Sequence, residues 1–552
     1  MGKWVKSGSP WIWMTGGAVS ISLIAVLGLL LLIAWRGLSY FWPADLYQWQ
    51  LEDSQGQKAT LIGEIYDREE VPSERLISAG HKFQQQPGEF VTRYLVKTGN
   101  REFVGLDFRW ILATDIISRE VPSGLAKFER TKNGNFYGYP IAVIEDGKRL
   151  ALAEGDLGSS LNAHIARSVA IADEALDLQK TDIGSINYRI ERLRLKERKH
   201  ELDGDLTEAK KASIEAQIAQ LNADYLVLEK RLFALRDAAS RDSVVIKDMR
   251  GEEVILKLDT VLAVSYVNDM STLDKLLHWF KGVGGFVVDD PREANTEGGV
   301  FPAIFGTVFM VMLMAVIVTP FGVIAAIYLH EYAKKGPITK MIRIAVINLA
   351  GVPSIVYGVF GLGFFVYMLG GSIDQLFYPE ALPAPTFGSP GVIWSALTLA
   401  ILTLPVVIVS TEEGLSRIPS AVRQGSLALG ATKAETLWRI VIPMASPAIM
   451  TGLILAVARA AGEVAPLMLV GVVKLAPTLP LDMNFPFVHL ERKFMHLGFH
   501  IYDVGFQSPN VEAARPLVYA TSFLLVSVIV ALNLTAISVR NHLREKFRSL
   551  EH

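Results

Sequence analysis

The sequence predicts an all-α membrane protein of six transmembrane helices, with an external α+β domain inserted after the first helix. Its mean hydropathy is +0.31, yet the apolar residues are unevenly spread along the 552 residues. Six runs are rich in Leu, Ile, Val, Ala, Phe and Gly, and about 20 such residues suffice for a helix to cross a bilayer. The stretch at about 37–298 is instead polar and charged, so it is expected to lie outside the membrane.

The first apolar run reaches from about Trp11 to Trp35, and we interpret it as a membrane anchor that is not cleaved. A secretory signal has a shorter apolar core and ends in small residues, whereas this run ends in Ile33-Ala34-Trp35-Arg36. Tryptophans flank both of its ends, as is typical of the two membrane interfaces. Residues 1–36 are therefore expected to form the cytoplasmic N-terminus and the first transmembrane helix.

The positive charges of the loops predict the orientation of the chain, because short cytoplasmic loops are rich in Lys and Arg. Five further spans are expected at about 302–329, 342–369, 391–410, 447–472 and 516–537. The charges precede the first span, lie in the loops after the second and the fourth, and follow the sixth: Lys3, Lys6, Lys334, Lys335, Lys340, Arg343, Arg417, Arg423, Lys433, Arg439, Arg540, Arg544, Lys546 and Arg548. All of these segments share one side if the spans alternate.

This pattern predicts that both termini are cytoplasmic, including a C-terminal tail at 541–552. The domain at 37–298 is then external, which means periplasmic in a host with two membranes. The expected location is the inner membrane of the cell, crossed several times.

The external domain is expected to combine strands with a helical hairpin at about 158–240. Segments such as 59–66 and 243–248 alternate apolar and polar residues, which favours short strands. Apolar residues of the hairpin recur at alternating spacings of four and three, which is typical of a coiled-coil seam: Ile214, Ile218, Leu221, Tyr225, Leu228, Leu232 and Leu235. The hairpin is either a docking arm for a partner or a self-packed coiled coil.

The loop at about 412–446 predicts a short amphipathic helix, a glycine turn, a second helix and a proline that enters the next span. Gly430 suits a helix end that needs a left-handed residue, and Pro443 suits the first turn of a helix. A helix-turn-helix between two spans on the cytoplasmic side has the shape of a coupling element. Its candidate residues are Gln424, Gly425, Ser426, Gly430, Ile440 and Pro443.

The spacing of these residues resembles the EAA loop of ABC importer permeases, although Gln424-Gly425-Ser426 stands where that family has Glu-Ala-Ala. Four further segments resemble the phosphate-importer permeases of the PstA type: 295–299, 327–332, 352–358 and 456–467. The resemblance covers the first anchor and roughly residues 290–540, and it does not cover the hairpin. It is most specific in the run that contains Glu463.

The resemblance implies a six-helix type I ABC importer permease, with five of its spans in a core at about 299–540. The implied partners are two ATP-binding subunits, a second homologous permease of the PstC type, a periplasmic phosphate-binding protein and membrane lipid. The implied function is ATP-driven import of inorganic phosphate by alternating access. The sequence has no G-x-x-x-x-G-K-[ST] loop for ATP, so we expect a transporter subunit rather than an enzyme. No catalytic site, cofactor or nucleic-acid partner is expected.

Two charged residues within the expected fifth span are candidates for the anion pathway. Arg459 and Glu463 are four residues apart and would share one face of a helix. A charge at the centre of a bilayer costs about 2.5–3.5 kcal/mol on insertion scales, so both side chains should face the bundle or the pore. Arg459 offers a planar donor group that matches phosphate oxygens, and Glu463 could accept a hydrogen bond from the P–OH of hydrogen phosphate. The alternative is a structural ion pair.

Two other functions are compatible with the sequence. An importer of the same type could carry another oxyanion, such as sulfate, molybdate or phosphonate, because the soluble receptor does most of the substrate selection in such importers. A membrane sensor is the rival from another class, but six spans and short cytoplasmic loops argue against it. The sequence has no cysteine, and His496 and His500 lack the context of a metal site, so no metal is expected.

Overall fold

The protein, described from a computed structural model, forms two compact units. The structure describes residues 9–52, 56–78, 90–150, 155–508 and 511–547. One unit, here called the membrane unit, comprises residues 1–40, 287–290 and 300–552, and the other, the inserted domain, comprises 41–286 and 291–299. Lys3, Lys6 and Arg548, which contribute to the predicted orientation, lie outside the described residues.

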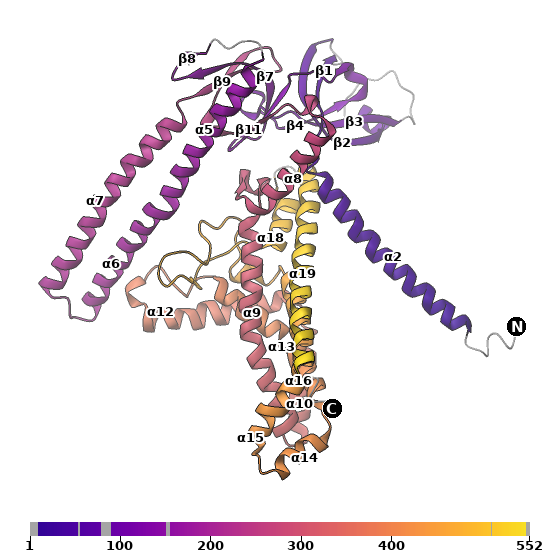
Figure 1. Ribbon diagram of the computed structural model, residues 1–552, viewed down its shortest axis with the longest axis vertical. Coiled ribbons are helices and arrows are strands. Elements are labelled where there is room, and N and C mark those ends of the chain that lie inside the picture. Colours follow the sequence, from indigo (N-terminus) through magenta and orange to yellow (C-terminus); the bar gives the residue numbers. More distant parts are fainter. Residues whose placement is uncertain (1–8, 53–55, 79–89, 151–154, 509–510, 548–552) are drawn as a thin grey trace. The chain divides into compact units, whose positions relative to one another are not determined.

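The long secondary-structure elements described in the membrane unit are helices (Figure 1). Its helices are α2 (Ser9–Ser39), α9 (Phe301–Ile327), α10 (Pro337–Leu349), α11 (Ser354–Phe360), α12 (Gly371–Phe377), α13 (Val392–Ser416), α14 (Ser420–Ala428), α15 (Lys433–Thr436), α16 (Ile442–Gly462), α17 (Leu467–Val470), α18 (Leu497–Tyr502) and α19 (Val511–Phe547). Wider π-helical turns extend several of them, namely Tyr328–Tyr332, Gly361–Gly370, Leu437–Val441 and Asp503–Gln507. Helix α8 (Thr272–Val288) leads from the inserted domain into the membrane unit.

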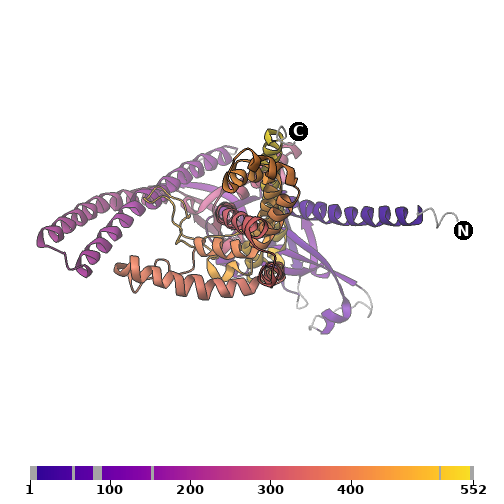
Figure 2. The same ribbon diagram turned by 90° about the horizontal axis from the view of Figure 1, so that it is seen from below.

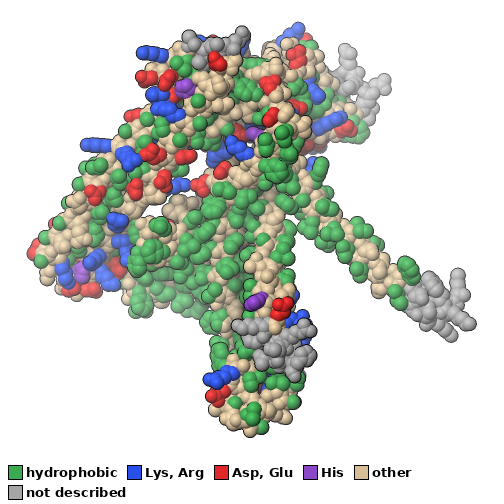
Figure 3. Space-filling model, viewed as in Figure 1, with side chains coloured by type: hydrophobic (Ala, Val, Ile, Leu, Met, Phe, Trp, Pro, Cys, Tyr) green, Lys and Arg blue, Asp and Glu red, His purple; other side chains and the backbone are tan. Residues whose placement is uncertain are grey.

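The predicted number of six membrane helices is confirmed. Six helices of the described chain are long and apolar enough to span a bilayer: Trp11–Ser39, Phe301–Tyr332, Ser354–Phe377, Val392–Ser416, Lys433–Gly462 and Ala514–Glu545. Hydrophobic side chains cover the visible surface of the helices near α9, whereas charged side chains gather on the hairpin of the inserted domain (Figure 3). An apolar surface of this extent is unfavourable in water, and it is suited to contact with lipid or with partner helices.

The bounds predicted for the third span, 342–369, are wrong. Residues up to Leu349 belong to the separate helix α10, and the candidate span begins only at Ser354. Pro353 stands between the two helices, and a proline disfavours helical backbone at the residue before it. Hydropathy alone merges the two helices because both carry many apolar residues.

The core of the membrane unit lies where α9, α13 and α16 pack together. Fully buried side chains from these three helices form one cluster that includes Met310, Met314, Leu399, Val407, Ala456 and Ala460. Small residues permit a close approach, since a Cβ added to Gly452 on α16 would lie 2.6 Å from the Cβ of Ser410 on α13. Close contact through small residues is a usual way for membrane helices to associate.

The inserted domain contains the strands that the alternating segments predict, and most of them form two antiparallel sheets. One has the strand order β4-β3-β2-β1-β5, and the other has the order β10-β9-β7-β6-β11 with β8 paired to β7. The strands are β1 (Leu46–Glu52), β2 (Lys58–Pro72), β3 (Phe90–Lys97), β4 (Phe108–Leu112), β5 (Ile116–Glu120), β6 (Ala126–Arg130), β7 (Phe136–Glu145), β8 (Lys148–Arg149), β9 (Ser243–Lys247), β10 (Glu253–Lys257) and β11 (Val261–Ser265). Short helices α3 (Ser73–Ser78) and α4 (Arg101–Val104) connect strands, and β12 (Pro291–Arg292) pairs with β13 (Glu297–Gly298).

A long two-helix hairpin projects from the second sheet. Its first arm consists of α5 (Leu157–Leu178), a π-helical turn and α6 (Gly184–Leu202), and its second arm is α7 (Glu208–Ala239). Figures 1 and 2 both show α7 beside α5 and α6. Ala175, Leu178, Ile183 and Leu232 form the buried contact between the arms, with Tyr225, Leu228 and Leu235 of the predicted seam packed around them. At the base, the hydroxyl of Ser168 donates to the carbonyl of Ala239 at 2.8 Å.

Asn100 joins two parts of the inserted domain, and we expect its replacement to destabilise that domain. Its side-chain amide donates to the carbonyl of Tyr137 at 3.0 Å and accepts from the amide of Tyr137 at 2.8 Å. The residue is fully buried and has a φ of 55°, a conformation that asparagine tolerates better than alanine. Asn100→Ala leaves buried backbone groups without partners, each of which costs about 1–3 kcal/mol.

The full chain in detergent tests this prediction by thermal unfolding. We expect Asn100→Ala to lower the Tm of the transition that includes the inserted domain by several degrees. The matched control is Asn222→Ala, because Asn222 is exposed on α7. Equal Tm values for the two variants would contradict the role assigned to Asn100.

Candidate functional site

The loop predicted to couple the protein to a partner forms two helices joined by a tight turn. Helix α14 ends before Gly430, which has a φ of +88°, a conformation that glycine adopts without strain. Helix α15 begins with a capping box, in which the side chains of Thr432 and Glu435 each accept from the other residue's backbone. Pro443 is the second residue of α16, and this helix directly continues the π-helical turn Leu437–Val441.

The candidate residues of this loop divide into exposed and buried ones. Gln424 and Gly425 are exposed, while Ser426 is buried and shares a hydrogen bond of 2.8 Å with the hydroxyl of Thr436. This bond joins α14 to α15 and helps to hold them as one element. Ile440 and Pro443 are half-buried at the base of the loop.

The tip of the loop exposes an apolar side chain that the sequence analysis did not single out. Leu429 is 91% exposed, and Leu427 on α14 is 48% exposed. Below them, Leu415, Ile418, Leu437, Val441 and Ala445 form a small buried cluster that fixes the loop on α13 and α16. The loop therefore presents an apolar tip on a rigid base, which is the arrangement of a docking element. The sequence feature that could have revealed this apolar tip is the pair of leucines on either side of Ala428, at the end of an otherwise polar helix.

Glu331 connects the loop to the end of α9, a contact that the sequence did not reveal. Its carboxylate lies 3.2 Å from the guanidinium of Arg423 on α14, and its side chain is only 11% exposed. Its backbone carbonyl accepts a hydrogen bond from Lys433, the first residue of α15. Lys433 also lies over the ring of Tyr332, 4.3 Å from its centre. Both helices of the loop are thus attached to one π-helical turn.

Arg343 of α10 forms a second connection at the same end of the membrane unit. Its guanidinium lies 3.2 Å from Glu412 in the last turns of α13 and donates to the carbonyl of Leu329 at 3.0 Å. Helices α9, α10 and α13 are consequently held together next to the loop. Glu331 and Arg343 thus link the end of α9 to α14, α10 and α13.

Arg459 and Glu463 form an ion pair at the end of α16. The Nε of Arg459 lies 3.6 Å from the carboxylate of Glu463, and the side chains are 34% and 19% exposed. The prediction that both lie within a span reaching residue 472 is wrong, because α16 ends at Gly462 and Glu463 has extended backbone angles. The four-residue spacing brings the two charged side chains together, but Glu463 follows the last residue of the helix.

The segment after α16 packs between two other helices. A Cβ added to Gly358 of α11 would lie 2.7 Å from the Cα of Pro466, and one added to Gly498 of α18 would lie 2.6 Å from Val464. Two segments that were singled out separately in the sequence, 352–358 and 456–467, are therefore neighbours in the structure. The Arg459–Glu463 pair lies beside a junction of three helices, where a shift of one helix would change its surroundings.

Two of the histidines near the last long loop, His489 and His496, have polar partners within the protein. His489 lies 3.0 Å from Asp482 and 3.2 Å from Glu491, and the Nδ1 of His496 accepts from the amide of Gly498 at 3.1 Å. Burial lowers the pKa of His496 and of His500 to about 4, so both rings are neutral near pH 7. Within the described ranges, no group of three or more His, Asp or Glu side chains is placed to hold a metal ion.

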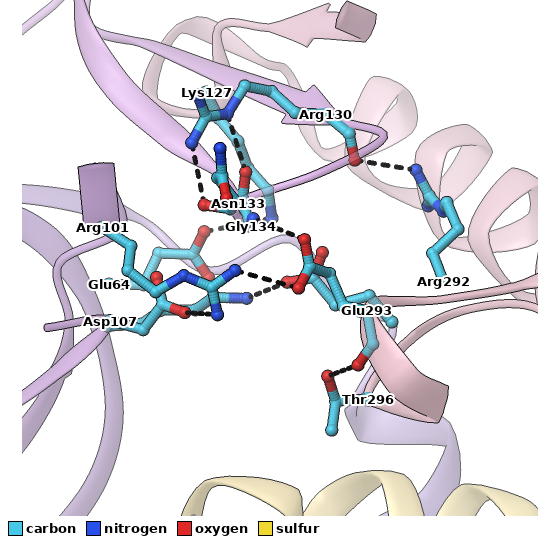
Figure 4. A network of polar contacts seen from close by, with 12 residues as sticks. Glu64, Arg101, Asp107, Lys127, Arg130, Asn133, Gly134, Arg292, Glu293 and Thr296 are labelled. Atoms are coloured by element: carbon cyan, nitrogen blue, oxygen red, sulfur yellow. Dashed lines mark hydrogen bonds and ion pairs between the residues drawn. The ribbon is translucent and has the colours of Figure 1, made fainter. Parts of the chain in front are cut away.

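A network of charged side chains in the inserted domain holds the chain just before α9 (Figure 4). Glu293 lies 3.0 Å from Arg101, and Glu297 lies 2.9 Å from Lys97. Arg292 donates to the carbonyl of Arg130 at 3.2 Å. The turn between β12 and β13 contains consecutive residues with positive φ, at Glu293, Ala294 and Asn295. Such backbone costs energy and persists only where surrounding contacts fix it.

The same network reaches into the interior of the domain. Lys127 lies 3.0 Å from the carboxylate of Glu64, which also accepts from the hydroxyl of Tyr137 at 2.8 Å. Burial acts to raise the pKa of Glu64, but the charges of Lys127 and Lys97 outweigh it and hold that pKa below its ordinary value. Burial beside Glu64 raises the pKa of Tyr137 well above its ordinary value. The domain therefore keeps an ionised carboxylate inside by surrounding it with donors.

Comparison with known families gives a match over the second part of the chain. Residues 318–549 match the family described as "Binding-protein-dependent transport system inner membrane component". This range contains α10 to α19, including both helices of the loop around Gly430, and the Arg459–Glu463 pair.

Individual proteins are similar to parts of this chain. The chain is 34% identical over 245 residues to "Phosphate transport system permease protein PstA 1" of Mycobacterium tuberculosis, which covers 44% of this chain and 71% of that protein. It is 38% identical over 175 residues to "Phosphate transport system permease protein PstA" of Mycobacterium leprae, with 32% and 52% covered. Among solved structures, the inward-facing MetNI methionine ABC transporter aligns with a TM-score of 0.33 at 15% identity, over 44% of this chain and 94% of that one.

Proposed function

This chain belongs to the PstA family of phosphate transport system permeases, and we propose that it is a membrane-spanning subunit of an ATP-driven importer of inorganic phosphate. The observation that carries this conclusion is the 34% identity over 245 residues to the Mycobacterium tuberculosis permease, over most of that protein. The chain is a transporter subunit and not an enzyme, because ATP hydrolysis in this family resides in a separate subunit. Its function is to form a passage for the anion.

The coupling loop supplies the contact with the ATP-binding subunit in this proposal. The exposed side chains Gln424, Leu427 and Leu429 stand on a base fixed by Ser426 and by the buried cluster below it. An apolar tip rimmed by polar residues suits a groove in a partner protein. A pair of ATP-binding subunits would then act on this loop and on the equivalent loop of a second permease of the PstC type.

The orientation of the chain follows from its charges. The loops after the second and fourth candidate spans carry Arg and Lys residues, which favour the cytoplasm. The coupling loop and both termini are then cytoplasmic, and the inserted domain is periplasmic in the inner membrane. In this orientation a periplasmic phosphate-binding protein meets the side that carries the inserted domain. The hairpin of α5, α6 and α7, a coiled coil in this proposal, is a docking arm for that protein or for a partner subunit.

We assign the anion pathway to Arg459, which lies beside the junction of α11, α16 and α18. The guanidinium is partly exposed and its fork of donors matches phosphate oxygens. Glu463 lies within 3.6 Å and is placed to accept a hydrogen bond from a protonated phosphate oxygen, a group that sulfate lacks at neutral pH. The junction with α11 and α18 allows this pair to be exposed or covered as the helices move.

Glu331 is expected to couple ATP hydrolysis to transport. Glu331→Gln keeps the shape of the side chain but removes the charge beside Arg423, which is itself mostly buried. Removing one member of a buried pair costs about 3–5 kcal/mol, and less where water has access. We expect phosphate uptake to fall about tenfold or more, because a change of 1.4 kcal/mol already changes an equilibrium tenfold.

The measurement compares ATP hydrolysis and uptake in the same proteoliposomes. A retained ATPase rate with lost uptake supports coupling through Glu331, whereas a parallel loss of both indicates damage to assembly. The matched control is Glu413→Gln, because Glu413 is 65% exposed and pairs with Arg417 on the surface. If Glu331→Gln transports as well as Glu413→Gln, Glu331 has no role in coupling.

The proposed function itself is tested by reconstitution. The chain is assembled with its candidate partner permease, ATP-binding subunit and binding protein, and ATP-dependent uptake of radiolabelled phosphate is measured with sulfate and phosphonate as competitors. Uptake that only unlabelled phosphate suppresses supports the proposal. If the complex hydrolyses ATP but imports a different oxyanion, that oxyanion and not phosphate is the substrate.

A further inference from the structure

Helix α8 exposes a continuous apolar face that none of the contacts described above uses. Leu273, Leu276, Leu277 and Phe280 are 64%, 41%, 60% and 59% exposed. At 3.6 residues per turn, these side chains fall within an arc of about 100° around the helix, and Gly284 and Val288 lie on the same face. No charged residue lies within this arc, and Lys281 and Asp274 flank it on one side. The face is an unbroken apolar stripe along a helix of 17 residues.

The opposite face of α8 is fixed against the inserted domain. Phe286 is buried and its ring lies 5.1 Å from that of Phe41. Gly282 allows this approach, since an added Cβ would lie 3.7 Å from Phe41. Lys275 forms an ion pair of 2.6 Å with Asp45. The rotation of α8 about its axis is therefore determined by packing, and the apolar stripe is directed outwards by the fold.

The covalent chain holds α8 near the ends of two membrane spans. Phe41, which packs on α8, follows Ser39, the last residue of the candidate span α2. Val288, the last residue of α8, precedes the start of α9 at Phe301 by a short connection. Trp42, next to Phe41, is 44% exposed and belongs to the aromatic residues expected at a membrane interface. The apolar stripe is thus continuous in the chain with the boundary of the bilayer.

We propose that α8 is an interfacial helix whose apolar stripe is buried in the outer leaflet of the membrane. An amphipathic helix with one apolar and one polar face lies in the plane of the interface and inserts the apolar face among the acyl chains. Lys281 at the edge of the stripe is placed to extend its ammonium group to the lipid headgroups. Asp289 and Asp290, which follow the helix, are exposed to water. The bilayer, rather than a protein, covers Leu273, Leu277 and Phe280.

The lipid is favoured as the occupant for two physical reasons. A protein partner usually brings polar contacts to the rim and hot spots to the centre, whereas this stripe is uniformly apolar along the helix axis. The membrane is also the partner to which the chain is already attached on both sides of α8. The helix would hold the inserted domain at the membrane surface by a contact separate from the spans.

Spin labels on single cysteines test this proposal directly, because the natural sequence has no cysteine. Leu273→Cys, Leu277→Cys and Phe280→Cys are labelled separately with a nitroxide in the full chain, assembled with cysteine-free partner subunits in lipid nanodiscs. The accessibility of each label to oxygen, which partitions into lipid, is compared with its accessibility to a water-soluble nickel chelate. The matched control is Ile255→Cys on β10, where the native side chain is 61% exposed and belongs to the same domain.

We expect the three α8 labels to be reached several times more readily by oxygen than by the nickel chelate, and the Ile255→Cys label to show the opposite order. Nickel accessibility on α8 equal to that at Ile255→Cys would overturn the proposal. Labels on α8 that are shielded from both reagents, and that change when the binding protein is added, would overturn it in favour of a protein partner. Three separate positions guard against a single substitution that disturbs the helix.

Discussion

Replacing Gly430 with proline is expected to abolish phosphate uptake while the membrane helices remain folded. Gly430 has a φ of +88°, and proline is restricted to a φ of about −65°. The substitution also removes the N–H that donates to the carbonyl of Leu427 at 3.0 Å. The turn between α14 and α15 cannot form, so the apolar tip with Leu429 is displaced from its base.

The measurement is ATP-dependent uptake in proteoliposomes, with complex assembly followed by size-exclusion chromatography. The matched control is Gly251→Pro in the turn between β9 and β10. Gly251 has a φ of +85° and donates to the carbonyl of Asp248 at 3.0 Å, so the same substitution imposes the same local strain elsewhere. We expect Gly251→Pro to transport and Gly430→Pro to fail. Normal uptake by Gly430→Pro would mean that the conformation of this turn has no part in coupling.

Arg459→Gln is expected to lower phosphate uptake about tenfold or more, because it removes a charge-assisted contact to the anion worth about 1.5–3 kcal/mol. Arg459→Lys keeps the charge without the planar fork and should recover only part of the uptake. The ATPase rate should persist in both variants, since Arg459 lies at the end of α16 that is remote in sequence from the coupling loop. The measurement is the initial rate of uptake over a range of phosphate concentrations.

A structural ion pair would behave differently. In that case Arg459→Gln and Glu463→Gln should both reduce the amount of assembled complex, and uptake per complex should stay constant. The matched control is Arg417→Gln, because Arg417 and Glu413 form an ion pair of the same sequence spacing at 3.7 Å on the surface. Normal uptake by folded and assembled Arg459→Gln would exclude Arg459 from the anion pathway.

Local patterns in the sequence were sufficient to predict the six membrane helices, the helical hairpin and the presence of short strands. The number of membrane helices depends on runs of apolar residues, and the strands of the inserted domain depend on alternation within a few residues. The turn at Gly430 and the helix start at Pro443 were also accessible, because backbone preference is a property of the residue itself. Each of these signals is contained in a segment of the chain no longer than one helix.

The bounds of two spans depended on details that hydropathy does not record. The break at Pro353 separates α10 from the third span, although both sides are apolar. The fifth helix ends at Gly462, and Glu463 continues in an extended conformation that lets Pro466 contact Gly358 of α11. A packing contact of this kind decides where a helix ends, and the residues that provide it are distant in sequence.

The sequence by itself determined the class of the protein, its membrane helices, the helix-turn-helix around Gly430 and its family, because each follows from the composition or order of neighbouring residues. Only the tertiary structure decided that Glu331 joins α9 to Arg423, that Glu293 joins Arg101 across 192 positions, and which face of α8 is exposed. These contacts arise when helices and strands already formed are packed together. The free energy of a charge or an apolar face depends on what packing places beside it, which a linear pattern does not contain.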